Sequence, residues 1–265
     1  MLSLDHPVVM GVVNVTPDSF SDGGRFFDPR RAIDHGLALV AQGAQIVDVG
    51  GESTRSGASP VAPDEELRRV IDVIAGLAAQ NVIVSVDTRH AAVAEQAIQH
   101  GASIINDVSG LRDPAMRQVA ARYGVPVVIM HSPVDDPVTM QQHAHYGDVV
   151  GDVIAFLQHQ SDLARVDGVE QIIVDPGIGF GKTAEHNLEL IRRLDEIVAL
   201  GYPVLVGASR KRFIGDITHT DRPADRLAGT LTAHLAALDC GARLIRAHDV
   251  AEHLQAIRMW QALHP

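Results

Sequence analysis

The chain has 265 residues, of which 46% are hydrophobic, so it is long enough to bury one large core and has about the length of a single α/β barrel. Its net charge of -11 argues against a general nucleic-acid or anionic-membrane surface, and any anionic ligand must therefore meet a local basic cluster. The first apolar run, residues 7–13, is too short for a membrane span or a signal sequence, and the single cysteine, Cys240, fits a reducing, cytoplasmic setting.

Short runs rich in β-branched residues recur along the chain and predict strands. There are eight of them, at residues 7–13, 45–50, 82–87, 103–107, 126–131, 171–175, 203–209 and 243–248. Between the runs, apolar residues return at helical spacing, as in Leu67, Val70, Ile71 and Ile74. The pattern is therefore strand and helix in alternation throughout.

Helix boundaries are marked by residues with known end preferences. Asp28-Pro29 and Asp113-Pro114 each have the form of an N-cap followed by proline in the first helical turn. Glycines follow the helical patterns and precede the next strand, as left-handed caps do; they are Gly43, Gly101, Gly124, Gly168, Gly201 and Gly241.

These features predict a (β/α)8 TIM barrel that forms one domain over residues 1–265. Near-continuous apolar strands that alternate with helices favour a parallel sheet buried on both faces, and eight such units fit a closed barrel better than an open sheet. Ligands then belong at the carboxyl ends of the strands, where the strand-to-helix loops gather.

Polar or unusual residues stand at nearly every one of these strand ends. In chain order they are Asn14, the GGESTR segment, Asp87, Asn106, Met130, the DPGIGFGK segment, Lys211, and Arg246 with His248. The opposite ends of the strands have short glycine turns instead. This asymmetry marks the candidate active face.

Two carboxylates, Asp87 and Asp175, are expected to converge there with the carboxamide of Asn106 and the ammonium of Lys211. Such a set suits a flat heterocycle, because a carboxylate accepts parallel hydrogen bonds from an amidine edge while lysine donates to a ring carbonyl. The alternative is that the buried acids and the lysine pair only with one another.

A second group of residues suits a phosphate or pyrophosphate. Arg55, Arg246 and His248, with Asn14 and the glycine-rich loops, offer positive charge and N–H donors. The glycines of residues 175–182 match neither a P-loop nor a dinucleotide fingerprint. For a metal, Mg²⁺ on Asn14 and pyrophosphate oxygens is favoured over a histidine site.

Two long segments, NVTPDSFSDGG at residues 14–24 and DVGGESTRSGA at residues 48–58, resemble the signature loops of the dihydropteroate synthase family. Shorter matches follow in the family order and span nearly the whole chain; they are SVDT, IINDVSG, DPGIGFGKT, GASRK and RAHDV. The resemblance implies the condensation of p-aminobenzoate with 6-hydroxymethyl-7,8-dihydropterin pyrophosphate, in folate synthesis, by an SN1-like substitution that releases pyrophosphate.

The resemblance also implies site residues, a cofactor and an assembly. The pterin pocket would be formed by Asp87, Asn106, Met130, Asp175, Phe180, Gly207 and Lys211. Pyrophosphate would meet Asn14, Arg55, Arg246 and His248, with Mg²⁺ on Asn14. The p-aminobenzoate slot would be formed by Thr54, Arg55, Ser56, Phe180, Lys211 and Arg212. Catalytic roles would fall to Asp87, Lys211, Arg55 and Asp18, in a sulfonamide-sensitive homodimer.

The sequence departs from the family pattern at two positions near the p-aminobenzoate slot. Ser56 stands where the family commonly has a proline, and Arg212 stands where many members have serine. Three alternatives stay open: a methyltetrahydrofolate methyltransferase-type barrel, a non-catalytic pterin-binding paralogue, and a Schiff-base aldolase that uses Lys211. The first would not need the pyrophosphate cluster.

Overall fold

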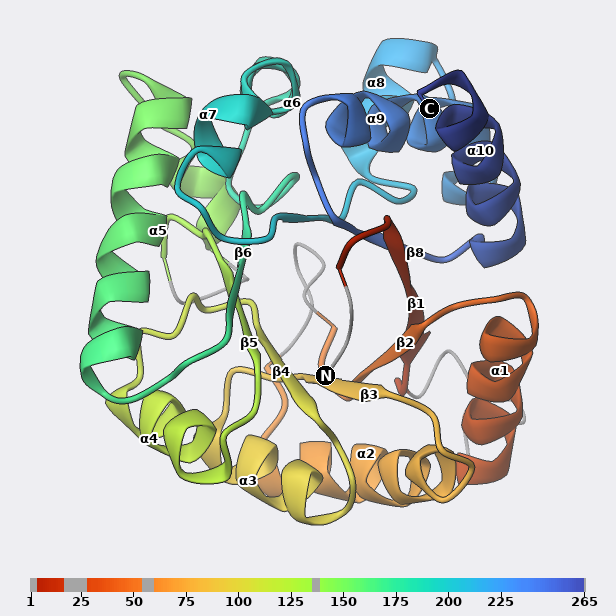
Figure 1. Ribbon diagram of the computed structural model, residues 1–265, viewed down its shortest axis with the longest axis vertical. Coiled ribbons are helices and arrows are strands. Elements are labelled where there is room, and N and C mark those ends of the chain that lie inside the picture. The colour runs from red at the N-terminus through yellow and green to blue at the C-terminus, as the bar shows by residue number, and fades with distance from the viewer. Residues whose placement is uncertain (1–3, 17–27, 54–59, 135–138, 265) are drawn as a thin grey trace.

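The computed structural model describes residues 4–16, 28–53, 60–134 and 139–264, and it confirms all eight predicted strands (Figure 1). They are β1 Val8–Asn14, β2 Ile46–Gly50, β3 Val84–Asp87, β4 Ile104–Asp107, β5 Val127–Met130, β6 Ile172–Asp175, β7 Leu205–Val206 and β8 Leu244–Ala247. β7 is shorter than the predicted run of residues 203–209, and Val204 just before it forms an isolated bridge with Val174.

The strands form one parallel sheet that curls into a barrel, as predicted. Their order is β6-β5-β4-β3-β2-β1-β8-β7, and each named pair is parallel. The ring is completed between β6 and β7, where Val174 forms a bridge with Val204 and its N–H donates to the Pro203 carbonyl oxygen at 2.9 Å. The chain is therefore a single TIM barrel.

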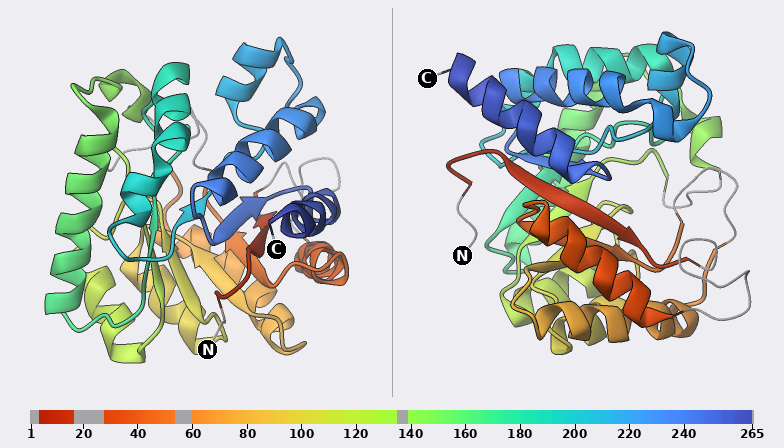
Figure 2. Two further views of the ribbon diagram at one scale, coloured as in Figure 1. Left: turned by 45° about the horizontal axis from the view of Figure 1, so that its top comes forward. Right: turned by 90° about the vertical axis from the view of Figure 1, so that its right-hand side faces the viewer.

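Helices surround the barrel on its outside (Figures 1 and 2). They are α1 Pro29–Ala41, α2 Pro63–Ala78, α3 Ala91–Gln99, α4 Pro114–Tyr123, α5 Val149–Val166, α6 Ala184–Arg192, α7 Leu194–Val198, α8 Arg212–Thr218, α9 Leu227–Asp239 and α10 Val250–Leu263, with two 3₁₀ turns at Met140–His143 and Pro223–Asp225. Within the described ranges, none of these helices is long and apolar enough to cross a membrane.

The predicted helix ends are confirmed by their local hydrogen bonds. The Asp28 carboxylate accepts from the Arg30 N–H at 2.9 Å, and the Asp113 carboxylate accepts from the Ala115 N–H at 2.9 Å. α4 ends at Gly124, which has a left-handed φ of 64°. A side chain is strained there, so glycine is the natural stop.

The alternation of side chains along each strand separates two cores. One cluster points outward against the helices and includes Val9, Val47, Ile105 and Val174. The other fills the inside of the barrel and is formed by Val8, Met10, Ile46, Ile104, Val128, Ile173, Leu205 and Leu244. Because side chains two residues apart share a face, the residue two positions after each interior apolar residue also faces the barrel axis.

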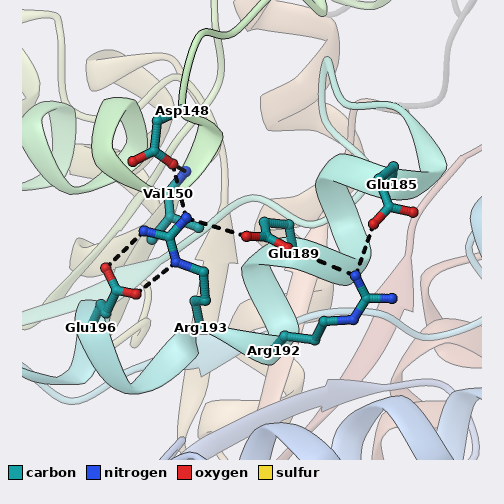
Figure 3. A network of polar contacts seen from close by, with 7 residues as sticks. All are labelled: Asp148, Val150, Glu185, Glu189, Arg192, Arg193 and Glu196. Atoms are coloured by element: carbon teal, nitrogen blue, oxygen red, sulfur yellow. Dashed lines mark hydrogen bonds and ion pairs between the residues drawn. The ribbon is translucent and has the colours of Figure 1, made fainter.

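An ion-pair network ties three helices together on the outside of the barrel (Figure 3). Arg193, between α6 and α7, contacts Asp148 at the start of α5 at 3.1 Å, Glu189 at 3.2 Å and Glu196 at 2.6 Å. The groups are well exposed, so solvent screens these pairs. The network connects α5, α6 and α7 at the surface and is separate from the strand ends.

Candidate active site

The strand ends bring the predicted polar residues onto the inner face of the barrel. Asn106 follows interior Ile104 by two residues, Asp175 follows Ile173, and Arg246 follows Leu244. In the register of the sheet, Asp87 stands opposite Asn106. In the same way, buried Met130 stands opposite Asp175. The expected convergence at the carboxyl ends is therefore present.

Arg246 joins two carboxylates at the centre of this face. Its Nε donates to Asp48 Oδ2 at 2.6 Å, and its Nη2 donates to Asp87 Oδ2 at 2.7 Å. The Asn106 side-chain amide donates to the same Asp48 oxygen at 3.0 Å. These contacts hold three strand ends, β2, β3 and β4, against β8.

Burial and crowding shift the ionisation of the central groups. Burial raises the pKa of Asp87 to about 7, against the opposing effect of Arg246 and with support from nearby Asp48. Burial lowers the pKa of Lys211 to about 7, although Asp175 opposes the shift. Burial also raises the pKa of Asp175, and the Lys211 charge opposes that change. The site holds titratable groups poised near neutrality, as ligand-binding and catalytic sites often do.

Lys211 and Phe180 are brought together by the loops after β7 and β6. The Lys211 ammonium lies 4.1 Å from the centre of the partly exposed Phe180 ring and also donates to the Ile178 carbonyl oxygen. The Asp175 carboxylate is oriented by the Gly177 N–H, which donates to its Oδ1 at 2.7 Å. A cation, an aromatic ring and an oriented carboxylate therefore lie close together, and these are groups that can bind a flat heterocycle.

The buried side chain of Lys182 holds the loop of residues 176–181 through hydrogen bonds to its backbone. Its buried ammonium donates to the carbonyl oxygens of Gly177 at 2.9 Å and Phe180 at 3.0 Å, and it lies 2.9 Å from His131 Nδ1. Burial, followed by the Lys182 charge, lowers the pKa of His131 to about 2, so its neutral ring accepts a hydrogen bond from lysine. Within the described ranges, no three His, Cys, Asp or Glu side chains group in a way that could hold a metal ion.

The described residues that were predicted to bind the anion, Asn14, Arg246 and His248, lie at the ends of the neighbouring strands β1 and β8. His248 follows β8, and its Nδ1 lies 2.9 Å from the Ser209 hydroxyl oxygen in the loop after β7.

The structure also places other predicted site residues. Gly207, predicted for the pterin pocket, packs against Arg246: a Cβ added at Gly207 would lie 3.6 Å from the Arg246 Cβ. Asn14, the last residue of β1, is partly exposed. The side chain of Arg212 is 90% exposed, and its Nε lies 3.7 Å from Asp216.

Comparison with known proteins identifies the family. Residues 10–248 match the family model described as pterin binding enzyme. The dihydropteroate synthase of Mycobacterium leprae is 47% identical over 267 residues, which covers 97% of this chain and 94% of the relative. The chain belongs to the dihydropteroate synthase family.

Solved structures of this family have the same fold. Dihydropteroate synthase from Thermus thermophilus in complex with 4-aminobenzoate matches with a TM-score of 0.91 and 50% identity, covering 99% of this chain and 96% of that chain. The enzyme from Xanthomonas albilineans in complex with 7,8-dihydropteroate matches with a TM-score of 0.90 and 45% identity, covering 99% and 95%.

Several residues that the family resemblance implied lie outside the described residues. They are Asp18, Thr54, Arg55 and Ser56. Their proposed roles in catalysis, in binding pyrophosphate and in binding p-aminobenzoate therefore stay predictions.

Sequence reasoning missed two residues of this dihydropteroate synthase family site. Asp48 is fully buried and contacts both Arg246 and Asn106. The sequence feature that could have revealed Asp48 is its position two residues after interior Ile46 of β2, at the start of a signature segment. Lys182 ends the DPGIGFGK segment, and no local sequence pattern shows that its side chain turns inward.

Proposed function

We propose that this chain is a dihydropteroate synthase of folate biosynthesis. It joins p-aminobenzoate to 6-hydroxymethyl-7,8-dihydropterin pyrophosphate and gives 7,8-dihydropteroate and pyrophosphate. One observation supports this most directly: Asp87, Asn106, Asp175 and Lys211 meet on one face of a barrel whose ligand-bound relatives carry 4-aminobenzoate or 7,8-dihydropteroate.

The polar set matches the hydrogen-bonding edges of a pterin. In this proposal, Asp175 accepts from the ring N–H and the exocyclic amino group, and Lys211 donates to the ring carbonyl. Phe180, under the Lys211 ammonium, offers an aromatic face to the ring. Asn106 and Met130 complete the pocket, and Arg246 lies across its floor between Asp48 and Asp87.

The substitution balances without an added oxidant or a strong base. The bond between the hydroxymethyl carbon and the pyrophosphate oxygen breaks, and its electron pair leaves with pyrophosphate. The arylamine nitrogen then forms the new C–N bond with its lone pair and gives up a proton to solvent. In this proposal Asp87 and Asp175 stabilise the cationic pterin, whereas Arg55, Arg246 and His248 stabilise the departing anion.

We also propose that Mg²⁺ takes part, with Asn14 as its protein ligand. The residues fit, because Mg²⁺ keeps several waters and uses phosphate oxygens, so that one partly exposed carboxamide at the end of β1 suffices. When bound, the ion would supply positive charge against the pyrophosphate. Loss of activity in excess EDTA, restored by added Mg²⁺, would support this role.

The wider setting is likewise proposed from the family resemblance: a cytoplasmic homodimer that sulfonamides inhibit. The single cysteine fits a reducing compartment. Sedimentation would give the oligomeric state, and cell fractionation would give the location.

The deciding experiment supplies both substrates and Mg²⁺ to the purified protein and measures dihydropteroate and pyrophosphate. Equal amounts of the two products are expected, and Lys211→Ala, which removes no core packing, should form neither while unfolding at a temperature near that of the parent. A pterin-binding protein that forms no product would be a non-catalytic paralogue. Methyl transfer from methyltetrahydrofolate, or borohydride trapping of a ketone on Lys211, would instead support the other two alternatives.

A further inference from the structure

Two buried histidines lie on the helices α9 and α10, outside the set of residues to which the proposed reaction gives a role. His234 on α9 and His253 on α10 are each 1% exposed. Their ring centres are 5.0 Å apart, and His234 Nδ1 lies 2.8 Å from His253 Nε2. The two helices lie side by side next to β8 (Figure 1). Buried polar groups of this kind need a reason, because leaving them unpaired is costly.

The two ends of this pair set the direction of its hydrogen bonds. The Ala208 backbone N–H donates to His234 Nε2 at 2.8 Å, and His253 Nδ1 lies 2.5 Å from the Asp249 carbonyl oxygen. An amide N–H can only donate and a carbonyl oxygen can only accept. Each ring must therefore be neutral and carry its proton on Nδ1.

The electrostatics agree with two neutral rings. Burial is the main cause that lowers the pKa of both histidines, and the nearby Lys211 ammonium lowers that of His234 further. A second proton on either ring would turn an acceptor into a donor that faces another donor. The pair is thus a fixed connector between one donor and one acceptor.

The connector begins in the loop that carries Lys211. The Lys211 N–H donates to the Ala208 carbonyl oxygen at 3.2 Å, so the residue held by His234 also anchors the lysine backbone. Between them stands Arg210, with a left-handed φ of 60°. A non-glycine residue keeps that conformation only when its surroundings hold it.

The histidine pair ends at Asp249, in the loop that carries His248. Side chains of the loops after β7 and β8 also contact each other directly. Arg210 donates to both carboxylate oxygens of Asp249, at 3.0 Å from Nε and 2.5 Å from Nη2. The His248 N–H donates to the Ser209 hydroxyl at 3.2 Å. The loops after β7 and β8 are therefore joined both through the histidines and by direct contacts.

We propose that His234 and His253 are positioning residues that hold the loop of Lys211 in register with the loop of His248. This role rests on the proposed function, because those loops would supply the cation for the pterin and a donor for the departing pyrophosphate. Errors of about 1 Å in such an arrangement can lower a rate by about 100-fold. Two neutral rings suit the task because their hydrogen bonds stay the same across the working pH range.

The first test does not depend on activity. In the ¹⁵N-labelled protein, long-range ¹H–¹⁵N correlation spectra report which ring nitrogen carries the proton. Both histidines are expected as neutral Nδ1–H forms, the minor tautomer of free histidine. A proton on Nε2 of His234, or a doubly protonated ring at either position, would overturn the proposed connector.

The second test compares two variants at position 234 with a control variant at an exposed histidine. His234→Leu removes the acceptor for the Ala208 N–H, whereas His234→Gln keeps an oxygen near the Nε2 position. The leucine variant should lose about 10- to 100-fold in kcat with a small change in KM for p-aminobenzoate, and glutamine should restore most of the loss. His159→Leu, on the exposed side of α5, should behave as the parent.

If the leucine variant does not fold, His234→Asn takes its place. Asparagine reaches only the Nδ1 position and leaves Ala208 unpaired, so it should lose activity where glutamine keeps it. A folded leucine or asparagine variant with parental kcat would refute the proposal. A parent enzyme that forms no dihydropteroate would instead refute the proposed function, so the two failures are distinguishable.

Discussion

Arg246 Nε lies 2.6 Å from Asp48 Oδ2, although the two residues are 198 positions apart in the sequence. The contact joins β8 to β2 across the intervening β1 and places an arginine at the centre of the site. Asp48 also accepts from Asn106, so one buried carboxylate orients two residues that we assign to the substrates.

Asp48→Asn tests this arrangement. The amide keeps the shape of the side chain but removes the negative charge that holds Arg246, leaving Asp87 as the acidic partner. Because a hydrogen bond to a charged group contributes about 1.5 to 3 kcal/mol, kcat/KM for the pterin substrate should fall by about 10- to 100-fold. Asp72→Asn, on the exposed side of α2, is the control. Parental kcat/KM in Asp48→Asn would show that the contact does not orient the site.

The pH dependence of kcat/KM for the pterin substrate should be bell-shaped. The raised pKa of Asp87, about 7, means that its carboxylate is lost as pH falls below that value. The lowered pKa of Lys211, also about 7, means that its ammonium is lost as pH rises above it. If both charges are needed, the maximum lies near pH 7.

Lys211→Arg separates the two limbs of that profile, because arginine stays charged. Its remaining activity should keep the acid limb and lose the alkaline limb. Rates are measured from pH 5 to 9 at saturating p-aminobenzoate. A flat profile for the parent enzyme would contradict both assignments.

Gly177→Ala should be far more damaging than Gly124→Ala, although both glycines have left-handed backbones. At Gly177, φ is 68° and an added Cβ would lie 1.9 Å from the His131 carbonyl oxygen; at Gly124, φ is 64° and no atom lies within 4 Å. The conformation alone costs about 1 to 2 kcal/mol, and the clash should add about 1 to 3 kcal/mol at Gly177. Urea unfolding measures both changes, and equal losses would show that the loop relaxes to accept the methyl group.

Arg212→Ser tests whether this exposed arginine meets the carboxylate of p-aminobenzoate. An exposed charge pair contributes about 0.5 to 1 kcal/mol, so KM for p-aminobenzoate should rise by about two- to fivefold while KM for the pterin substrate stays the same. Inhibition by sulfanilamide, which lacks a carboxylate, should change less. Arg222→Ser removes another exposed arginine and serves as the control. A KM for p-aminobenzoate that does not change would leave Arg212 as a solvated residue.

The sequence alone determined the barrel and most of the described site. Strand side chains alternate with a period of two, and capping residues act within one turn of their helix, so both are readable locally. The strand-end position of Asp87, Asn106 and Asp175 followed from that alternation together with the parallel topology. Ile104 and Ile173 lie in the barrel interior, which confirms that the side chains two residues later, Asn106 and Asp175, face the same side.

Only the tertiary structure decided which of these groups meet. The pairing of Asp48 with Arg246 depends on how the sheet curls, since distant strands become neighbours across the barrel. The inward turn of Lys182 depends on hydrogen-bond acceptors that two separate loops supply. His234 and His253 stand in helical segments with no local sign of a ligand, and their partners come from the loops after β7 and β8. Long-range polar contacts follow from the packed geometry, which local sequence periodicity does not encode.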